Sequence, residues 1–261
     1  MKTMFVTTAG RTTEAMIAMA KQVAKDLGIK YIPRKKRSIS LLQEIEKDGC
    51  IVAGKERLEL YPLGEKEPFF FHPNSAMFRI KRLLKGEHDP FIDAARLQHG
   101  MSVIDCTLGL ASDSIVASFA VGLEGRVTGL EVNPFLAYVV KQGLSNWDSG
   151  LTEMNEAMTK ISVHNIFALD FLKTQKGDSA DCVYLDPMFE EAILESDGIR
   201  GLSRISYFGG ISEELIREAV RVAKKRVILK DHFRSTRFTQ FGFVVQLRKS
   251  AKFHYGVLEK H

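Results

Sequence analysis

Four short motifs each place an acidic residue where a buried strand is expected to end. The first is the apolar run Val103-Ile104-Asp105-Cys106, which continues through Gly109 into a predicted helix beginning near Ser112. A glycine in such a turn lets the backbone approach a ligand closely, and the N-terminus of the helix attracts a carboxylate. Asp105 suits an ammonium group or a water molecule held by one. Taken alone, this spacing is also typical of an ordinary strand-to-helix turn.

Two further carboxylates follow the same pattern. Glu131 ends the run Val127-Thr128-Gly129-Leu130, and an acidic residue at the end of the second strand of a nucleotide-binding unit accepts hydrogen bonds from ribose hydroxyls. Asp170 follows a third apolar run and could accept the exocyclic amine of an adenine, although a role as helix cap explains it equally well. A ligand that contains a nucleoside fits both residues.

The fourth motif, Val183-Tyr184-Leu185-Asp186-Pro187-Met188-Phe189, is the most specific. An exocyclic ring amine is a poor nucleophile because its lone pair is delocalised into the ring. Asp186, or a carbonyl in the turn, can accept an N–H hydrogen bond and favour a lone pair aimed at an electrophile. Pro187 restricts the turn, and Phe189 offers a ring face for stacking a base. The alternative is a strand that ends at proline, with Phe189 in the core.

Strands and helices that alternate after about residue 98 are expected to position these motifs. Such alternation predicts crossover connections and a parallel sheet. The last two apolar runs are so close in the chain that only a hairpin can join them. We expect an α/β fold with a mainly parallel seven-stranded sheet and a C-terminal antiparallel hairpin. The predicted strands are 103–106, 126–130, 161–164, 182–185, 226–229, 243–247 and 253–258, and the helices include 112–123, 134–144 and 213–223.

The N-terminal third has a different pattern of predicted elements and carries the net positive charge of the chain. Residues 1–98 contain 18 Lys+Arg and 12 Asp+Glu, whereas the remainder contains 19 and 20. Strands at 3–8, 50–53, 57–61 and 69–73 predict, together with three helices, a smaller α+β domain. The helices are expected at 12–27, ending at Gly28, after Ser38 as a cap, and from Asn74 as a cap to Lys85. We expect a basic substrate-recognition domain over 1–90 and a catalytic domain over 91–261. A basic module favours a polyanionic partner, RNA or DNA first, although a solvated surface explains the charge equally well.

Three basic residues are candidates for binding the substrate. Arg79 lies in the predicted helix from Asn74 to Lys85, which, with the turn Arg34 to Arg37, would face RNA. Arg11, in the loop Thr7 to Thr13, could hold a substrate phosphate, although a capped helix start is the simpler explanation. Lys230 follows the strand Val227-Ile228-Leu229 and could face a phosphate or lie on the surface.

Several classes of protein and site are not indicated. The chain lacks a Gly-x-Gly-x-x-Gly fingerprint and a Gly-Lys-Ser/Thr phosphate loop, which argues against dehydrogenases and P-loop enzymes. Cys50, Cys106 and Cys182 are widely spaced, so we expect buried thiols and neither disulfides nor a zinc site. The scattered histidines give no metal-ligand spacing. Without an apolar run of about 20 residues or a secretory signal, we expect a soluble cytoplasmic protein that needs neither membrane nor metal.

The motifs resemble those of the bacterial small-subunit rRNA (guanine-N2)-methyltransferases and of a related Gram-positive branch. The resemblance spans about residues 90–235. The first motif of that family, Asp-Ala-Thr-Ala-Gly-Leu-Gly-Arg-Asp, is matched at Asp105, Thr107, Gly109, Leu110 and Asp113 and departs at Leu108, Ala111 and Ser112. The family's Asp-Pro-Met-(Phe/Tyr)-Pro appears as Asp186-Pro187-Met188-Phe189-Glu190.

This resemblance implies a Rossmann-like class I methyltransferase fold and S-adenosylmethionine as the cofactor. It implies transfer of a methyl group to an exocyclic base nitrogen, guanine N2, in rRNA or a ribosomal subunit. Two alternatives stay open, a methyltransferase for protein or small molecules on the same fold, and an RNA-binding protein without catalysis. The implied cofactor contacts are Asp105, Thr107, Gly109, Leu110, Ser112, Asp113, Glu131, Val132, Asp170, Phe171 and Asp186.

Overall fold

The computed structural model describes residues 3–187, 210–249 and 251–260. By their contacts, these residues divide into two compact units. Residues 3–72 and 133–143 belong to the first unit, and the other described residues belong to the second. The helix predicted over Asn74 to Lys85 falls in the second unit, together with the four motifs.

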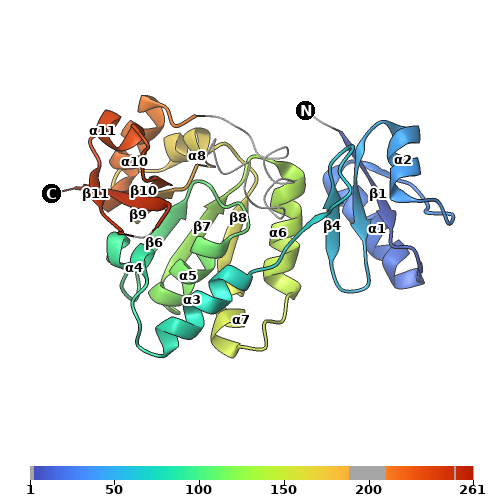
Figure 1. Cartoon of the computed structure of the whole chain (residues 1–261), viewed down its shortest axis with the longest axis horizontal. Coiled ribbons are helices and arrows are strands. Elements are labelled where there is room, and N and C mark those ends of the chain that lie inside the picture. Colours follow the sequence, from blue (N-terminus) through green and yellow to red (C-terminus); the bar gives the residue numbers. More distant parts are fainter. Residues whose placement is uncertain (1–2, 188–209, 250, 261) are drawn as a thin grey trace. The chain divides into compact units, whose positions relative to one another are not determined.

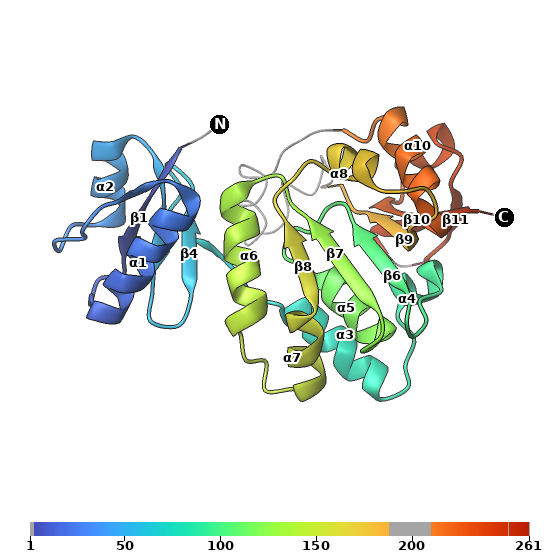
Figure 2. The same cartoon turned by 180° about the vertical axis from the view of Figure 1, so that it is seen from behind.

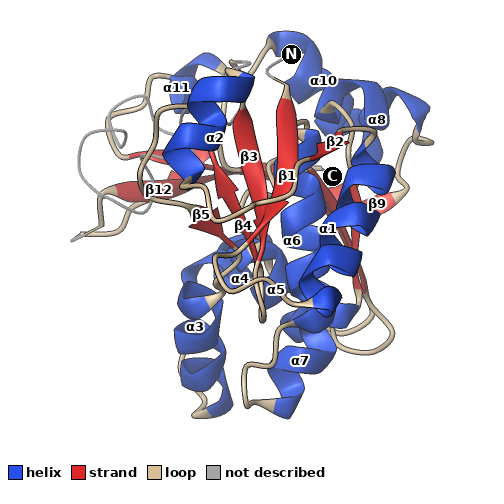
Figure 3. Ribbon diagram, turned by 90° about the vertical axis from the view of Figure 1, so that its right-hand side faces the viewer, coloured by secondary structure: helices blue, strands red, loops and turns tan. Residues whose placement is uncertain are grey.

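The first unit is built on a five-stranded sheet with the order β2-β1-β3-β4-β5. Strand β1 is parallel to β2 and β3, whereas β4 is antiparallel to β3 and β5. Every residue of β1 and β3 is buried, and these two neighbouring strands, each paired on both sides, lie side by side in Figure 3. The elements are β1 (Met4–Thr8), α1 (Glu14–Leu27), β2 (Lys30–Tyr31), α2 (Ile39–Glu46), β3 (Gly49–Ala53), β4 (Leu58–Tyr61) and β5 (Phe69–Phe70).

Local signals in the sequence explain where the two helices of this unit begin and end. The Thr13 side chain accepts a hydrogen bond from the amide of Met16 at the start of α1. Gly28 ends that helix in the left-handed conformation that glycine adopts readily. Ser38 caps α2 through the amide of Leu41, as predicted.

The second unit contains a seven-stranded sheet with the order β11-β12-β10-β9-β6-β7-β8. Strand β12 is antiparallel to β10 and β11, and the remaining pairs are parallel. The prediction of a mainly parallel sheet with a C-terminal antiparallel hairpin is therefore confirmed. The strands are β6 (Ser102–Asp105), β7 (Arg126–Leu130), β8 (Ile161–His164), β9 (Ala180–Leu185), β10 (Ala223–His232), β11 (Val244–Gln246) and β12 (Phe253–Glu259).

Helices cover this sheet. Helix α5 contacts both α3 and α7, and α8 contacts α10. Figures 1 and 2 show α3 and α5 on the same face of the sheet. The helices of the second unit are α3 (Asn74–Leu84), α4 (Pro90–Ala95), α5 (Ser112–Val121), α7 (Thr152–Thr159), α8 (Ala168–Thr174), α10 (Glu213–Val222) and α11 (Arg237–Gln240), while α6 (Pro134–Asn146) follows β7 in the chain.

Some short elements differ from the sequence-based expectation. Helix α4 was not predicted, although Asp89 caps it by accepting from the amides of Phe91 and Ile92, and Pro90 begins it. Asn74 was expected to cap α3, but it is the first residue of that helix, and the preceding Pro73 has no side chain able to accept a hydrogen bond. The three cysteines, Cys50, Cys106 and Cys182, are buried as predicted.

Candidate active site

Three of the four acidic motifs meet at one edge of the second sheet. Asp105 ends β6, Glu131 follows β7, and Asp186 follows β9. Strand β6 lies between β7 and β9 and is parallel to both, so their carboxyl ends share an edge. The order of strands reverses at β6, and open α/β sheets bind ligands outside the carboxyl ends of the strands at such a point. We call this edge the carboxyl edge.

Asp105 is almost completely buried, with 2% of its surface exposed. Its Oδ2 accepts a 2.6 Å hydrogen bond from the Ser114 hydroxyl, and its Oδ1 accepts from the amide of Thr107 at 3.0 Å. Burial raises the pKa of Asp105 to about 7, against the lowering effect of these two hydrogen bonds. The carboxylate therefore fixes the turn after β6, and its burial suits a water-mediated contact with an ammonium group better than a direct one.

Thr107 connects the first motif to the fourth. Its hydroxyl oxygen accepts a 2.7 Å hydrogen bond from the amide of Asp186 and lies 3.3 Å from Oδ1 of Asp105. The amide of Cys106 donates to the Tyr184 carbonyl, which extends the pairing of β6 with β9 to the edge of the sheet. The Thr107 side chain, together with this strand pairing, thus fixes the Asp186 turn beside the Asp105 turn.

Between β6 and α5, the backbone takes the left-handed conformation twice. Gly109 has φ +48° and Ala111 has φ +62°. The resembled family has glycine at the second position, and alanine accepts this conformation at a cost of roughly 1–2 kcal/mol. Ala111 is the N-cap residue of α5, and no side chain in the described part of the chain caps that helix. Its first amides, at Ser112 and Asp113, can therefore bind a carboxylate.

Asp113 lies in the first turn of α5 and forms a buried charge network. Its Oδ2 accepts hydrogen bonds from the Tyr184 hydroxyl at 2.8 Å and from Nζ of Lys230 at 3.0 Å, and its Oδ1 pairs with Arg79. Burial alone would raise the pKa of Asp113, but Lys230 and Arg79 hold it well below its usual range. Asp113 is therefore ionised and balanced by two cations.

Lys230 also pairs with Asp186. Its Nζ lies 2.6 Å from Oδ2 of Asp186, whose side chain is 23% exposed. Burial and the neighbouring Asp113 raise the pKa of Asp186 to about 6, although Lys230 opposes that rise. Burial also disfavours the charged ammonium, but Asp113 and Asp186 raise the pKa of Lys230 above its usual range. The site thus contains a carboxylate that titrates close to neutral pH, oriented by a permanently charged lysine.

Glu131 and Val132 are held in place by β8. The Glu131 amide donates to the His164 carbonyl at 3.0 Å, and the Asn165 side-chain amide donates to the carbonyls of Glu131 and Val132 at 2.8 and 2.9 Å. Glu131 is 8% exposed. The backbone after β7 is thereby fixed where the sequence predicts a ribose contact.

Asp170 and Phe171 lie in the first turn of α8, immediately after β8. Asp170 is exposed, and the Phe171 ring packs against His164 with centroids 5.5 Å apart. Phe167 precedes the helix as its N-cap residue, without a side-chain cap. Asp170 is therefore not the cap residue of α8, so the helix-cap role, considered as an alternative to an adenine contact, is excluded.

The remaining predicted residues lie in different surroundings. Arg11 is exposed in the first unit, where the nearby Thr13 caps α1. Arg79, predicted to contact substrate, makes a two-pronged ion pair with Asp89 in addition to its contact with Asp113. Pro187 directly follows Asp186 and is partly buried. Phe189 lies outside the described residues.

Sequence reasoning missed three residues of the site. Ser114, Tyr184 and Asn165 bind Asp105, Asp113 and the Glu131 backbone, respectively. Tyr184 gave a usable signal, because a tyrosine in an otherwise apolar buried strand needs a hydrogen-bond partner for its hydroxyl. Ser114 and Asn165 gave none, because serine in a helix and asparagine after a strand are common.

The residues at the carboxyl edge fit S-adenosylmethionine. The uncapped start of α5 suits the cofactor's carboxylate, Asp105 can act on its ammonium group through water, and Glu131 suits its ribose. Within the described residues, no group of histidine, cysteine or acidic side chains is arranged to bind a metal. None of the helices in that part of the chain is long and apolar enough to cross a membrane.

Comparison with known proteins agrees with this geometry. The chain is 47% identical to "Uncharacterized protein YpiP" of Bacillus subtilis over 97% of this chain and 98% of that protein. It is 31% identical to "Ribosomal RNA small subunit methyltransferase J" of Haemophilus influenzae over 69% of this chain and 72% of that protein. The chain spans about half the length of two other relatives with that name.

A solved structure and a family model extend the comparison. A crystal structure of a SAM-dependent methyltransferase from Neisseria gonorrhoeae superposes with a TM-score of 0.62 and 21% identity, covering 97% of this chain and 95% of that one. This likeness shows a shared fold. Residues 35–240 match the family described as "Putative SAM-dependent methyltransferase". The chain therefore belongs to the SAM-dependent methyltransferases and uses S-adenosylmethionine as its cofactor.

Proposed function

We propose that this methyltransferase transfers a methyl group to an exocyclic base nitrogen of small-subunit rRNA, guanine N2 in particular. The names of the relatives from Haemophilus and other bacteria support rRNA as the substrate. The resemblance in the Asp186 motif supports the choice of the nitrogen. The cytoplasm, where ribosomes are assembled, is the corresponding place of action.

The observation that carries the proposal is the fixed position of the Asp186 carboxylate. Nζ of Lys230 lies 2.6 Å from Oδ2 of Asp186, and the backbone amide of Asp186 donates a 2.7 Å hydrogen bond to the Thr107 hydroxyl. A carboxylate fixed in this way can accept an N–H hydrogen bond from an amine and direct the amine's lone pair. Methyl transfer to an ionised carboxylate has no need of such an acceptor, because a carboxylate has no hydrogen to donate. Positioning of this kind contributes much of the rate in a displacement reaction.

The other residues serve to bind and orient. S-adenosylmethionine supplies, when bound, a methyl group on a sulfonium. We assign the amides of Ser112 and Asp113 to the cofactor's carboxylate, Glu131 to its ribose and Asp170 to its adenine. Thr107, Gly109, Leu110, Val132 and Phe171 complete the proposed cofactor contacts.

Asp186 also gives the reaction a way to lose a proton. A methylated amine carries an extra proton, which Asp186 or a water beside it can accept, because the pKa of this carboxyl is close to neutral. Lys230 stays charged throughout and keeps the carboxylate oriented. A target phosphate would have to contact the same ammonium group that already donates to Asp113 and Asp186.

The test is methylation of ribosomal material from cells that lack this gene. The purified protein is incubated with tritiated S-adenosylmethionine and either naked small-subunit rRNA or assembled small subunits. We expect label in RNA, recovered after nuclease digestion as N2-methylguanosine. Label in the protein fraction, or on a base carbon or ribose oxygen, would contradict the proposal. Comparison of the two substrates shows whether the enzyme acts before or after assembly.

A further inference from the structure

The loop between β11 and β12 lies at the same edge of the sheet as Asp186. Strand β12 is antiparallel to β10, and its first residue, Phe253, pairs with His232, two residues beyond Lys230. The chain therefore leaves β11 and enters β12 at the carboxyl edge, next to the described residues 247–249 and 251–252. No part of the proposed function has used this loop.

An aromatic ring connects the loop to the site. The Phe253 ring lies 4.9 Å from Nζ of Lys230 and 4.7 Å from Cζ of Arg248. The Arg248 guanidinium also lies 5.9 Å from the Tyr255 ring. Attraction between a cation and an aromatic face holds both basic groups on this platform. The Phe253 ring therefore lies close to both Arg248 and Lys230, the lysine that orients Asp186.

Arg248 has unused hydrogen-bonding capacity. Its Nη1 is buried and has no hydrogen-bond partner within the described ranges. A buried donor without a partner is unfavourable unless a ligand or water satisfies it. A planar guanidinium with free donors matches the oxygens of a phosphate.

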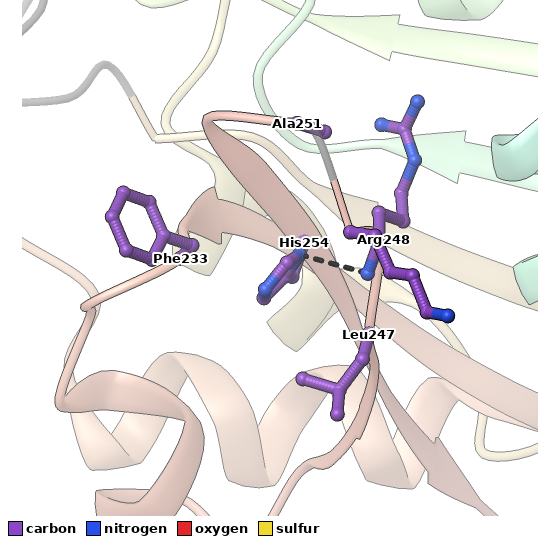
Figure 4. A pocket seen from close by; sticks show the side chains of 6 residues that line it. Phe233, Leu247, Arg248, Ala251 and His254 are labelled. Atoms are coloured by element: carbon purple, nitrogen blue, oxygen red, sulfur yellow. Dashed lines mark hydrogen bonds between the residues drawn. The ribbon is translucent and has the colours of Figure 1, made fainter.

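A pocket of about 330 Å³ opens beside this arginine (Figure 4). Phe233 lies 6.2 Å from the His254 ring, which accepts a hydrogen bond from the Arg248 amide. Phe233 and Leu247 are 43% and 81% exposed. The pocket residues, together with Arg234, form what we call the hairpin patch: Phe233, Arg234, Leu247, Arg248, Lys249, Ala251 and His254.

The charge of this region is one-sided. From His232 to Leu258 the sequence contains five Lys+Arg and no Asp or Glu. This local excess of positive charge is not visible in the net charge of residues 99–261, which is close to zero. Exposed aromatic rings among cations are typical of surfaces that bind single-stranded nucleic acid, where bases stack and phosphates pair with basic groups. An acidic peptide would pair with the cations but would leave the exposed Phe233 ring unused.

We propose that the hairpin patch binds the single-stranded RNA that flanks the target nucleotide. Arg248 and Lys249 contact backbone phosphates, and Phe233 stacks on an unpaired base. This inference rests on RNA being the substrate, as proposed above. It places a substrate contact in the catalytic unit itself, in addition to the basic N-terminal residues.

The test is binding of a fluorescein-labelled single-stranded RNA of about 12 nucleotides, within the roughly 4–16 nucleotides that single-strand sites cover. Anisotropy is measured with the full-length protein at several salt concentrations. We expect the double variant Arg248→Gln/Lys249→Gln to bind roughly tenfold more weakly, with a salt slope lower by about 1.4, since each lost phosphate contact removes about 0.7. Phe233→Ala is expected to weaken binding and leave the salt slope unchanged.

Three controls keep the test specific. Lys224→Gln changes an exposed lysine at the start of β10, at the opposite edge of the sheet, and is expected to leave RNA binding unchanged. Calorimetry with S-adenosylmethionine is expected to give wild-type affinity for every patch variant, which shows that each is folded. Labelled polyglutamate is expected to bind weakly and without dependence on Phe233.

The outcomes separate this inference from the proposed function. Wild-type RNA affinity and salt slope in both patch variants would overturn the hairpin patch and leave the RNA substrate standing. Failure of the wild type to bind RNA, with normal cofactor binding, would overturn the proposed function together with the patch. Polyglutamate binding as tight as RNA binding would show a general anion surface and would also overturn the assignment to RNA.

Discussion

Nζ of Lys230 lies 2.6 Å from Oδ2 of Asp186, and the same ammonium group contacts Asp113 at 3.0 Å. Asp186 follows β9 and lies in the proposed catalytic turn, whereas Asp113 lies in the first turn of α5, the helix proposed to bind the cofactor. One lysine therefore joins the two halves of the site. Its removal should affect both stability and catalysis.

Replacing Lys230 by methionine keeps an unbranched side chain only one atom shorter and removes its charge. Two poorly exposed carboxylates then lose a cation, and removing one partner of a buried ion pair costs about 3–5 kcal/mol of unfolding free energy. Urea denaturation at neutral pH measures the loss. Lys225→Met is a matched control, because Lys225 is 53% exposed and its ion pair with Asp181 lies at the surface. That pair is expected to contribute less than about 1 kcal/mol.

The same substitution should move the pH dependence of catalysis. Lys230 lowers the pKa of Asp186, which burial raises to about 6. We expect wild-type turnover to fall as the pH drops through about 6, because a protonated carboxyl no longer accepts the N–H hydrogen bond. In Lys230→Met this acid limb should lie at higher pH. An unchanged limb would show that Asp186 does not control the rate.

Thr107 offers a test of the link between the two turns. Thr107→Val preserves shape but leaves the Asp186 amide without its acceptor, which costs about 1–3 kcal/mol. We expect lower stability and roughly tenfold lower turnover, equivalent to about 1.4 kcal/mol in the barrier. Thr107→Ser keeps the hydroxyl and should retain most of the activity. Equal losses in both variants would point to packing instead of the hydrogen bond.

Because the pKa of Asp105 is raised in the folded chain, we expect the unfolding free energy to fall as the pH rises. Its pKa is about 7 in the folded chain against an ordinary 3.8. Between these values the folded state binds more protons than the unfolded state, so the unfolding free energy falls with increasing pH, by up to about 4 kcal/mol. Asp105→Asn removes this contribution. Urea denaturation at pH 5 and pH 7 should therefore show the variant gaining stability relative to wild type, whereas parallel changes would contradict the raised pKa.

The strand ends were predictable because a parallel sheet brings its carboxyl ends to one edge. Asp105, Glu131 and Asp186 lie far apart in the sequence, yet the alternation of strands and helices was enough to group them. The seven-stranded sheet and its hairpin followed from the same rule. Turn and cap signals at Gly28 and Ser38 also predicted real helix boundaries.

The ion pairs were not predictable, because they depend on packing between elements. Arg79 appeared to be one cation in a basic helix, but α3 packs on α5 and turns that guanidinium toward Asp113. Lys230 was equally compatible with a surface position. Neither partner could be inferred from spacing, because the pairs join residues 34 and 117 positions apart.

The most direct test of the central claim is single-turnover methyl transfer by Asp186→Asn. The substrate is the small-subunit rRNA that the wild type labels, and calorimetry measures the affinity of both proteins for S-adenosylmethionine. We expect the methyl-transfer rate to fall roughly 10²- to 10⁴-fold, with a much smaller loss of cofactor affinity, because the α5 and Glu131 contacts remain. Transfer at the wild-type rate by a variant that binds the cofactor normally would contradict the role of Asp186.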